Sequence, residues 1–201
     1  MWCQSVVICT LGVLAVNSRK VRVDVYMESL CPDTSRFMHH QLVPAYNQLK
    51  HHLHLQVIPF GKAYCQKESF HQLKCRCQHG IRECNMNAHM NCAIELAHND
   101  TDRALDGVMC LQDQRHVTST VRTCLSHANI PPSNLTSCAR GPHVHQLILA
   151  AQSRTFNLRP RLSWVPTVTL DDVVNWDALH DLKHEICAKL EPKPSECLDD
   201  R

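Results

Sequence analysis

The sequence lacks the features that mark three classes of protein. Basic residues are not in excess, because 21 Lys and Arg stand against 19 Asp and Glu, and a net charge of +2 does not indicate a nucleic-acid partner. No apolar run reaches the ~18 residues that a membrane span needs. Repeats and low-complexity tracts are also missing, and 44% hydrophobic residues in a 201-residue chain predict one ordinary folded core.

Cysteine and histidine, in contrast, are abundant, with 13 and 15 residues. Reducing compartments rarely hold so many cysteines outside metal proteins, which indicates an oxidising compartment. The 11 apolar residues Val6–Val16 are typical of the core of a signal peptide, although a buried strand is an alternative interpretation. A leader over residues 1–18 would remove Cys3 and Cys9, and thirteen minus two leaves eleven cysteines, of which at least one has no internal partner.

The first third of the chain has the pattern of a strand, a helix and a second strand. Apolar and polar residues alternate over 21–26, apolar residues recur at helical spacing over 37–46, and Leu53, Leu55 and Val57 alternate again. Pro44 is expected to bend the helix. This βαβ pattern predicts a parallel pair of strands within an α/β fold.

Residues 62–156 look like a helical insertion with eight cysteines, carried by a core formed from 19–61 and 157–201. Together these segments would form one domain over 19–201. A strand is expected at 165–170 with a turn at Asp171 and Asp172, and Asn175 is expected to cap a final helix. Helices within the insertion are expected at 80–98, 103–113, 118–128 and 143–156.

Cys31 follows the first strand directly and precedes Pro32 at the expected start of the helix. Unpaired backbone N–H groups at a helix N-terminus stabilise a thiolate, so this is the position of the nucleophile in thiol oxidoreductases. Those enzymes carry a second, resolving cysteine three positions further on, where this chain has Thr34. We therefore take Cys31 as the candidate nucleophile, with an ordinary disulfide as the alternative.

The segment Cys77–Cys92 matches every specified position of the pattern C-Q-H-G-x-x-E-C-x-x-N-x-x-x-x-C. In this it resembles the gamma-interferon-inducible lysosomal thiol reductase family, and the resemblance extends over about residues 21–197. The resemblance implies a thioredoxin-like fold with a large disulfide-rich helical insertion and an activity that reduces protein disulfides in acidic compartments. It also implies a C-x-x-C active site, from which Cys31-Pro32-Asp33-Thr34 departs.

Pro166 resembles the cis proline of thioredoxin-like folds that faces the active cysteine. There, the backbone of the preceding residue, here Val165, docks an extended substrate peptide. The alternative is a proline that merely begins a strand.

Ten cysteines besides Cys31 are expected to form structural disulfides, and the sequence does not choose among their pairings. Proximity suggests two pairs, 65–75 and 187–197, and two residues of one helix, 84 and 92, stand too far apart to pair with each other. Zinc binding by Cys77, His79 and their neighbours is an alternative, but the spacings do not fit, and no metal site is expected. The ten are Cys65, Cys75, Cys77, Cys84, Cys92, Cys110, Cys124, Cys138, Cys187 and Cys197.

Without a resolving thiol, we expect dithiol reductase activity to be lost or severely reduced, leaving protein binding or slow monothiol exchange through Cys31. The alternative is an active lysosomal reductase. Neither requires a cofactor, although cysteine or glutathione would serve as a co-reductant. The expected partner is a protein ligand or a disulfide-bearing substrate, and the chain is expected to be a monomer or a dimer linked through Cys31.

Asn99 and Asn134 begin two glycosylation triplets, which agree with a secretory route. The resemblance also implies a comparison with mammalian members of the family, which carry propeptides before the first strand and after the last cysteine. Only four residues follow Cys197 here, and strand one begins soon after the leader. We therefore expect a secreted protein, with the lysosome as the alternative.

Overall fold

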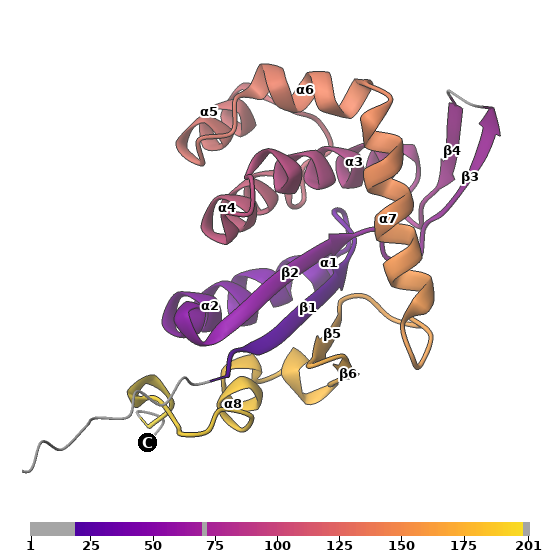
Figure 1. Ribbon diagram of the computed structural model, residues 1–201. Helices are drawn as coiled ribbons and strands as arrows, with labels where there is room; N and C mark the ends of the chain where they lie inside the picture. Colours follow the sequence, from indigo (N-terminus) through magenta and orange to yellow (C-terminus); the bar gives the residue numbers. More distant parts are fainter. Residues whose placement is uncertain (1–18, 70–71, 199–201) are drawn as a thin grey trace, which may run out of the picture.

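The computed structural model describes residues 19–69 and 72–198 (Figure 1), and the expected leader with Cys3 and Cys9 lies outside them. Its centre is a four-stranded sheet in the order β2-β1-β5-β6. β1 runs parallel to β2 and antiparallel to β5, which in turn pairs antiparallel with β6. The strands are β1 (Val21–Met27), β2 (Leu53–Pro59), β5 (Thr167–Leu170) and β6 (Val173–Val174).

β1 is more buried than its alternating sequence suggests, because Asp24 and Tyr26 lie inside as well as the valines. The strand is central, and helices cover both of its faces. The Asp24 carboxylate accepts a hydrogen bond of 3.0 Å from Arg154, which reaches it from α7. A buried charge is tolerated when it is paired in this way.

The expected helix after β1 is one run of three parts: α1 (Pro32–Phe37), a π-helical turn η1 (Met38–Leu42) and α2 (Val43–Leu49). Pro32 occupies the first turn, where its missing N–H leaves no hydrogen bond unmade. The irregularity expected from Pro44 takes the form of the wide turn just before it, where Val43 N–H bonds to the Met38 carbonyl. A short 3-10 turn, η2 (Lys50–His52), leads into β2.

The insertion is not helical throughout, which corrects the expectation for 62–156. It begins with an antiparallel hairpin of β3 (Tyr64–Ser69) and β4 (Gln72–Arg76), in which Cys65 stands opposite Cys75. One helix, α6, lies outside the four expected ranges; Pro131 is its cap residue and Pro132 its first residue, where the missing N–H leaves no hydrogen bond unmade. The helices are α3 (Ile81–Leu96), α4 (Thr101–Leu111), α5 (Ser119–His127), α6 (Pro132–Arg140) and α7 (His143–Asn157).

The insertion packs against β2, the edge strand, through α3, α4 and α7. Figure 1 shows α3 to α6 stacked beyond this edge, with α7 crossing beside the hairpin. Ala151 of α7 joins Tyr26 and Ile58 in one apolar cluster, so α7 covers the sheet face on which those two residues lie. The helical run α1–η1–α2 and the C-terminal helix α8 (Leu182–Cys187) pack with the other core cluster, which holds the valines of β1.

The C-terminal segment confirms the expected hairpin but not the expected long helix. Asp171 and Asp172 have positive φ values of 52° and 69°, as a tight turn between β5 and β6 requires. Asn175 caps only the 3-10 turn η3 (Asp177–Leu179), because the Asp181 side chain then accepts the His184 N–H and begins α8 as a separate helix. A last 3-10 turn, η4, covers Ser195–Cys197.

Candidate functional site

Cys31 lies where β1 passes into α1 and occupies the cap position of that helix. Its N–H donates to the Glu28 carbonyl at 3.4 Å, and its own carbonyl accepts the Ser35 N–H at 3.1 Å. The residue is 7% exposed. Within residues 19–69 and 72–198, it is the one free cysteine.

The Cys31 thiol lies close to the residue that precedes the predicted cis proline. The Val165–Pro166 peptide bond is cis, as expected. The Cys31 thiol lies 3.7 Å from the Val165 carbonyl oxygen, to which it donates a hydrogen bond. Cys31 and Val165, which are 134 positions apart in the chain, thus form one site. The role of Val165 and Pro166 in substrate docking stays a prediction.

Thr34 stands one helical turn after Cys31, in the place of a resolving cysteine, and is completely buried. Its hydroxyl makes no hydrogen bond to any described residue. A buried hydroxyl without a partner is unfavourable by about 1–3 kcal/mol, so packing alone does not explain a threonine here. The site therefore has one thiol and one unpaired hydroxyl where a C-x-x-C protein has two thiols.

The ten other cysteines of the described chain form five disulfides. Two of them, Cys65–Cys75 and Cys187–Cys197, are the pairs that proximity suggested. The remaining three are Cys77–Cys84, Cys92–Cys138 and Cys110–Cys124, so positions 84 and 92 do not pair with each other, as expected. Because these sulfurs are oxidised, the alternative of a cysteine-ligated zinc site is wrong.

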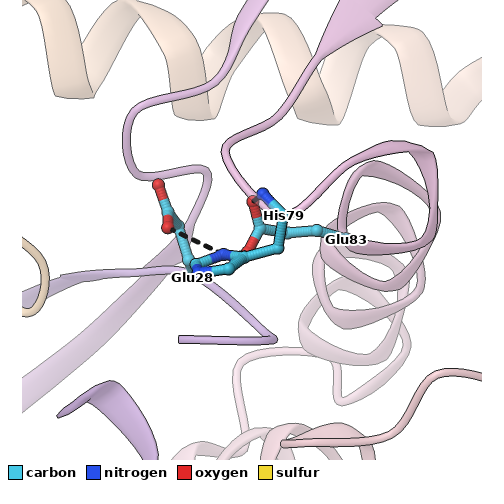
Figure 2. A group of neighbouring side chains, drawn as sticks. All are labelled: Glu28, His79 and Glu83. Carbon is cyan, nitrogen blue, oxygen red and sulfur yellow. Dashed lines mark hydrogen bonds and ion pairs between the residues drawn. The ribbon is translucent and has the colours of Figure 1, made fainter. Parts of the chain in front are cut away.

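The residues of the Cys77–Cys92 segment have a structural role that the sequence did not reveal: they hold the loop that precedes Cys31. The Asn87 side chain accepts the Ser29 N–H at 3.0 Å. His79 lies 3.5 Å from Glu28 through Nδ1, and the same nitrogen is hydrogen bonded to Glu83. Figure 2 shows Glu28 beside His79 and Glu83, where the loop after β1 meets the start of α3.

Glu28 is held in this cluster by its surroundings. Its Oε1 accepts the Lys62 N–H at 2.7 Å. Burial raises the pKa of the carboxyl, and the Lys62 hydrogen bond opposes that rise. Gly61 has a φ of +60°, and a Cβ added there would lie 2.2 Å from Glu28 Cγ, so glycine makes room for this side chain. Sequence reasoning did not identify Glu28.

A groove of about 370 Å³ lies between the helical run that follows Cys31 and the segment around the cis proline, and its lining includes Asp33 and Pro166 but not Cys31 itself. Trp164, which is half exposed, forms part of its wall, and Lys62 Nζ lies 5.3 Å from the centre of that indole ring. The lining residues are Asp33, Arg36, Phe37, His40, Gln41, Trp164, Pro166, Leu179 and His180.

Both expected glycosylation residues are accessible. Asn99 follows α3 with a φ of +66°, and Asn134 lies on α6; both are exposed. In the part of the chain that the structure describes, no helix is long and apolar enough to cross a membrane.

Solved structures of two bacterial proteins share this fold. BdbD from Bacillus subtilis matches with a TM-score of 0.57 at 14% identity, covering 83% of this chain and 85% of that one. DsbA from Mycobacterium tuberculosis matches with a TM-score of 0.55 at 14% identity, covering 89% and 88%. These likenesses show that the chain has a thioredoxin-like fold of the kind seen in DsbA.

Comparison with proteins of similar sequence identifies the family within this fold. The family model described as gamma interferon inducible lysosomal thiol reductase (GILT) matches residues 22–128. A GILT-like protein of Caenorhabditis elegans is 35% identical over 89% of this chain, which spans 55% of that relative's length. A gamma-interferon-inducible lysosomal thiol reductase-like protein of Anopheles gambiae is 33% identical over 94% of this chain and 84% of its own length. The chain belongs to the GILT family.

Proposed function

We propose that this protein engages disulfide-bearing proteins through the single thiol of Cys31, by binding or slow monothiol exchange, and has lost efficient dithiol reductase activity. One observation carries the proposal: Thr34 fills the resolving position, and every other described cysteine is tied in a disulfide. No second thiol among these residues is free to release a trapped substrate.

The chemistry follows from thiol–disulfide exchange. The Cys31 thiolate attacks a substrate disulfide, so that one S–S bond breaks, a mixed disulfide forms and a substrate thiolate leaves and takes up a proton. In a C-x-x-C enzyme the second cysteine then expels the substrate. Here two small thiols, such as glutathione or cysteine, must supply both electrons. They end as one small-molecule disulfide, while the substrate leaves as a dithiol and Cys31 returns to the thiol.

The groove between the helix after Cys31 and the cis proline supports a protein as the partner. It places the exposed indole of Trp164 and the apolar side chains of Phe37 and Leu179 beside polar and charged ones, among them Asp33 and Arg36. A peptide that offers both apolar and polar side chains would match this mixed lining. We propose secretion as the destination, supported by the exposed positions of Asn99 and Asn134.

Insulin reduction tests the proposal, with a small thiol present and at both pH 4.5 and pH 7. The variants are Thr34→Cys, Thr34→Ser as its size-matched control, and Cys31→Ser. We expect Thr34→Cys to raise the rate at least about 10-fold, because an internal thiol has a much higher effective concentration than an external one. Thr34→Ser should behave as the wild-type chain, and Cys31→Ser should be inactive.

A trapping measurement accompanies the rates. The wild-type chain should accumulate a mixed disulfide with substrate on non-reducing gels, and Thr34→Cys should not. Wild-type turnover close to that of Thr34→Cys would overturn the proposal in favour of an active reductase. A band at twice the mass without substrate, absent from Cys31→Ser, would show that the thiol serves dimer formation instead.

A further inference from the structure

We propose that Glu28, His79 and Glu83 form a binding site for a divalent transition-metal ion of the Zn²⁺ class, next to the loop that carries Cys31. The three side chains come from two segments that are distant in the sequence and meet at the start of α3 (Figure 2). Their ligand atoms all lie within 4.8 Å of one another. Imidazole nitrogen and carboxylate oxygen are common ligands of zinc.

The orientation of the two carboxylates is that of ligands fixed by outer hydrogen bonds. Glu83 Oε1 accepts the His79 N–H at 3.1 Å, and Glu28 Oε1 accepts the Lys62 N–H at 2.7 Å. Each group therefore has one oxygen tied to the backbone and turns its Oε2 toward His79 Nδ1. Metal ligands in proteins are typically held by such second contacts.

Charge in the cluster is unbalanced without a cation. Glu28 is 0% exposed, and its Oε2 has no hydrogen-bond partner among the described residues. His79 Nδ1 lies 3.5 Å away, but it carries at most one hydrogen, and that nitrogen is already hydrogen bonded to Glu83. One ring nitrogen cannot donate to two carboxylates at once, and a buried polar atom without a hydrogen bond is unfavourable. A divalent ion between the three atoms would satisfy both oxygens at once.

The site is also preformed and reachable. The Cys77–Cys84 disulfide closes the loop that carries His79 onto α3. Both glutamates are buried, whereas the His79 side chain keeps 31% of its surface exposed and gives a route from solvent. Three protein ligands leave a fourth position for water or an incoming group.

A bound ion would connect the segment before Cys31 to the insertion. The Glu28 carbonyl accepts the Cys31 N–H, so the backbone of one ligand contacts the backbone of the nucleophile. A metal here would fix the loop between β1 and α1 relative to α3.

Calorimetric titration of the chelator-treated chain with ZnCl₂ at pH 7.5 tests the site, together with melting in Zn²⁺ and in EDTA. We expect one ion per chain and a rise in Tm with Zn²⁺. His79→Ala and Glu28→Gln should weaken binding roughly 100-fold or more and lose the rise. His143→Ala, which removes another His–Glu pair on the surface, should bind as the wild-type chain does. Cys31→Ser should also bind normally, which excludes the free thiol as a ligand.

Cobalt gives a readout that needs no variant, because Co²⁺ held by nitrogen and oxygen ligands absorbs in the visible range and Zn²⁺ should abolish that band. Absence of stoichiometric Zn²⁺ binding in the wild-type chain would overturn the proposal. It would also be overturned if both His79→Ala and Glu28→Gln bound Zn²⁺ normally, or if the binding were lost in His143→Ala or Cys31→Ser.

Discussion

Replacing Gly61 by alanine should be one of the most destabilising small changes in this chain. At a φ of +60° a Cβ costs about 1–2 kcal/mol by itself. The added carbon would also lie 2.2 Å from Glu28 Cγ and 2.5 Å from its Oε1. To make room, the buried carboxylate must give up its hydrogen bond from Lys62, a bond to a charged group worth about 1.5–3 kcal/mol. The sum is about 2.5–5 kcal/mol, a large part of a domain's usual margin of about 5–15 kcal/mol.

Urea unfolding with the disulfides intact measures this loss, and a second background isolates its cause. Glu28→Ala removes every atom that the new Cβ would strike. In that background Gly61→Ala should therefore lower the free energy of unfolding by only the backbone strain, about 1–2 kcal/mol. An equal loss in both backgrounds, or a loss under about 1 kcal/mol in the wild-type chain, would refute the steric argument.

Three further outcomes follow from other parts of the molecule. Replacing Cys92 and Cys138 together by alanine should lower the free energy of unfolding by about 4 kcal/mol, because this disulfide spans 46 residues. Urea unfolding measures the change, and a loss under about 1 kcal/mol would contradict the prediction. Asp102 has a lowered pKa through its hydrogen bond from Lys50, so its contribution is present at pH 7 and is lost as pH falls through the folded pKa. Asp102→Asn should accordingly lower the free energy of unfolding by under about 1 kcal/mol at pH 7 and leave it unchanged near pH 2, and urea midpoints at the two pH values measure this. Iodoacetamide on the unreduced native protein should label Cys31 and no other cysteine in residues 19–198. If peptide mapping found Cys31 unlabelled even after unfolding without reduction, its sulfur would be bonded to another group and the prediction would be wrong.

Local patterns predicted the elements that surround the nucleophile. The valines of β1 and the proline after Cys31 obey rules that act over a few residues, whereas the cis Pro166 is predicted from its resemblance to thioredoxin-like folds; the structure places all of them as expected. The β5–β6 turn at Asp171 and Asp172 belongs to the same group. Thr34 could be read directly as a replacement, but its complete burial could not.

What escaped prediction depends on contacts between distant segments. The β3–β4 hairpin is mostly polar and exposed, and few apolar residues mark its strands in the sequence; Cys65 and Cys75 join the two strands. The ion cluster joins Glu28 to His79 across the interface of sheet and insertion. No sequence spacing relates these two residues, because only packing of α3 against the loop after β1 brings them together.

In each of the five disulfides one sulfur is less accessible than the other, which affects how the protein resists reduction by small thiols. One cysteine of every bridge is a buried residue: Cys65, Cys84, Cys92, Cys110 and Cys187. A small thiol attacks along the axis of the S–S bond and must reach a sulfur from solvent, so at each bridge the attack is restricted to the partner's side. Cys31 is 7% exposed and is shielded in the same way, so glutathione would recycle it by attacking the substrate's sulfur in the mixed disulfide, and no scaffold bridge contains such an external sulfur. The five structural disulfides would thus stay intact while Cys31, the one free thiol among the described residues, exchanges with substrate disulfides.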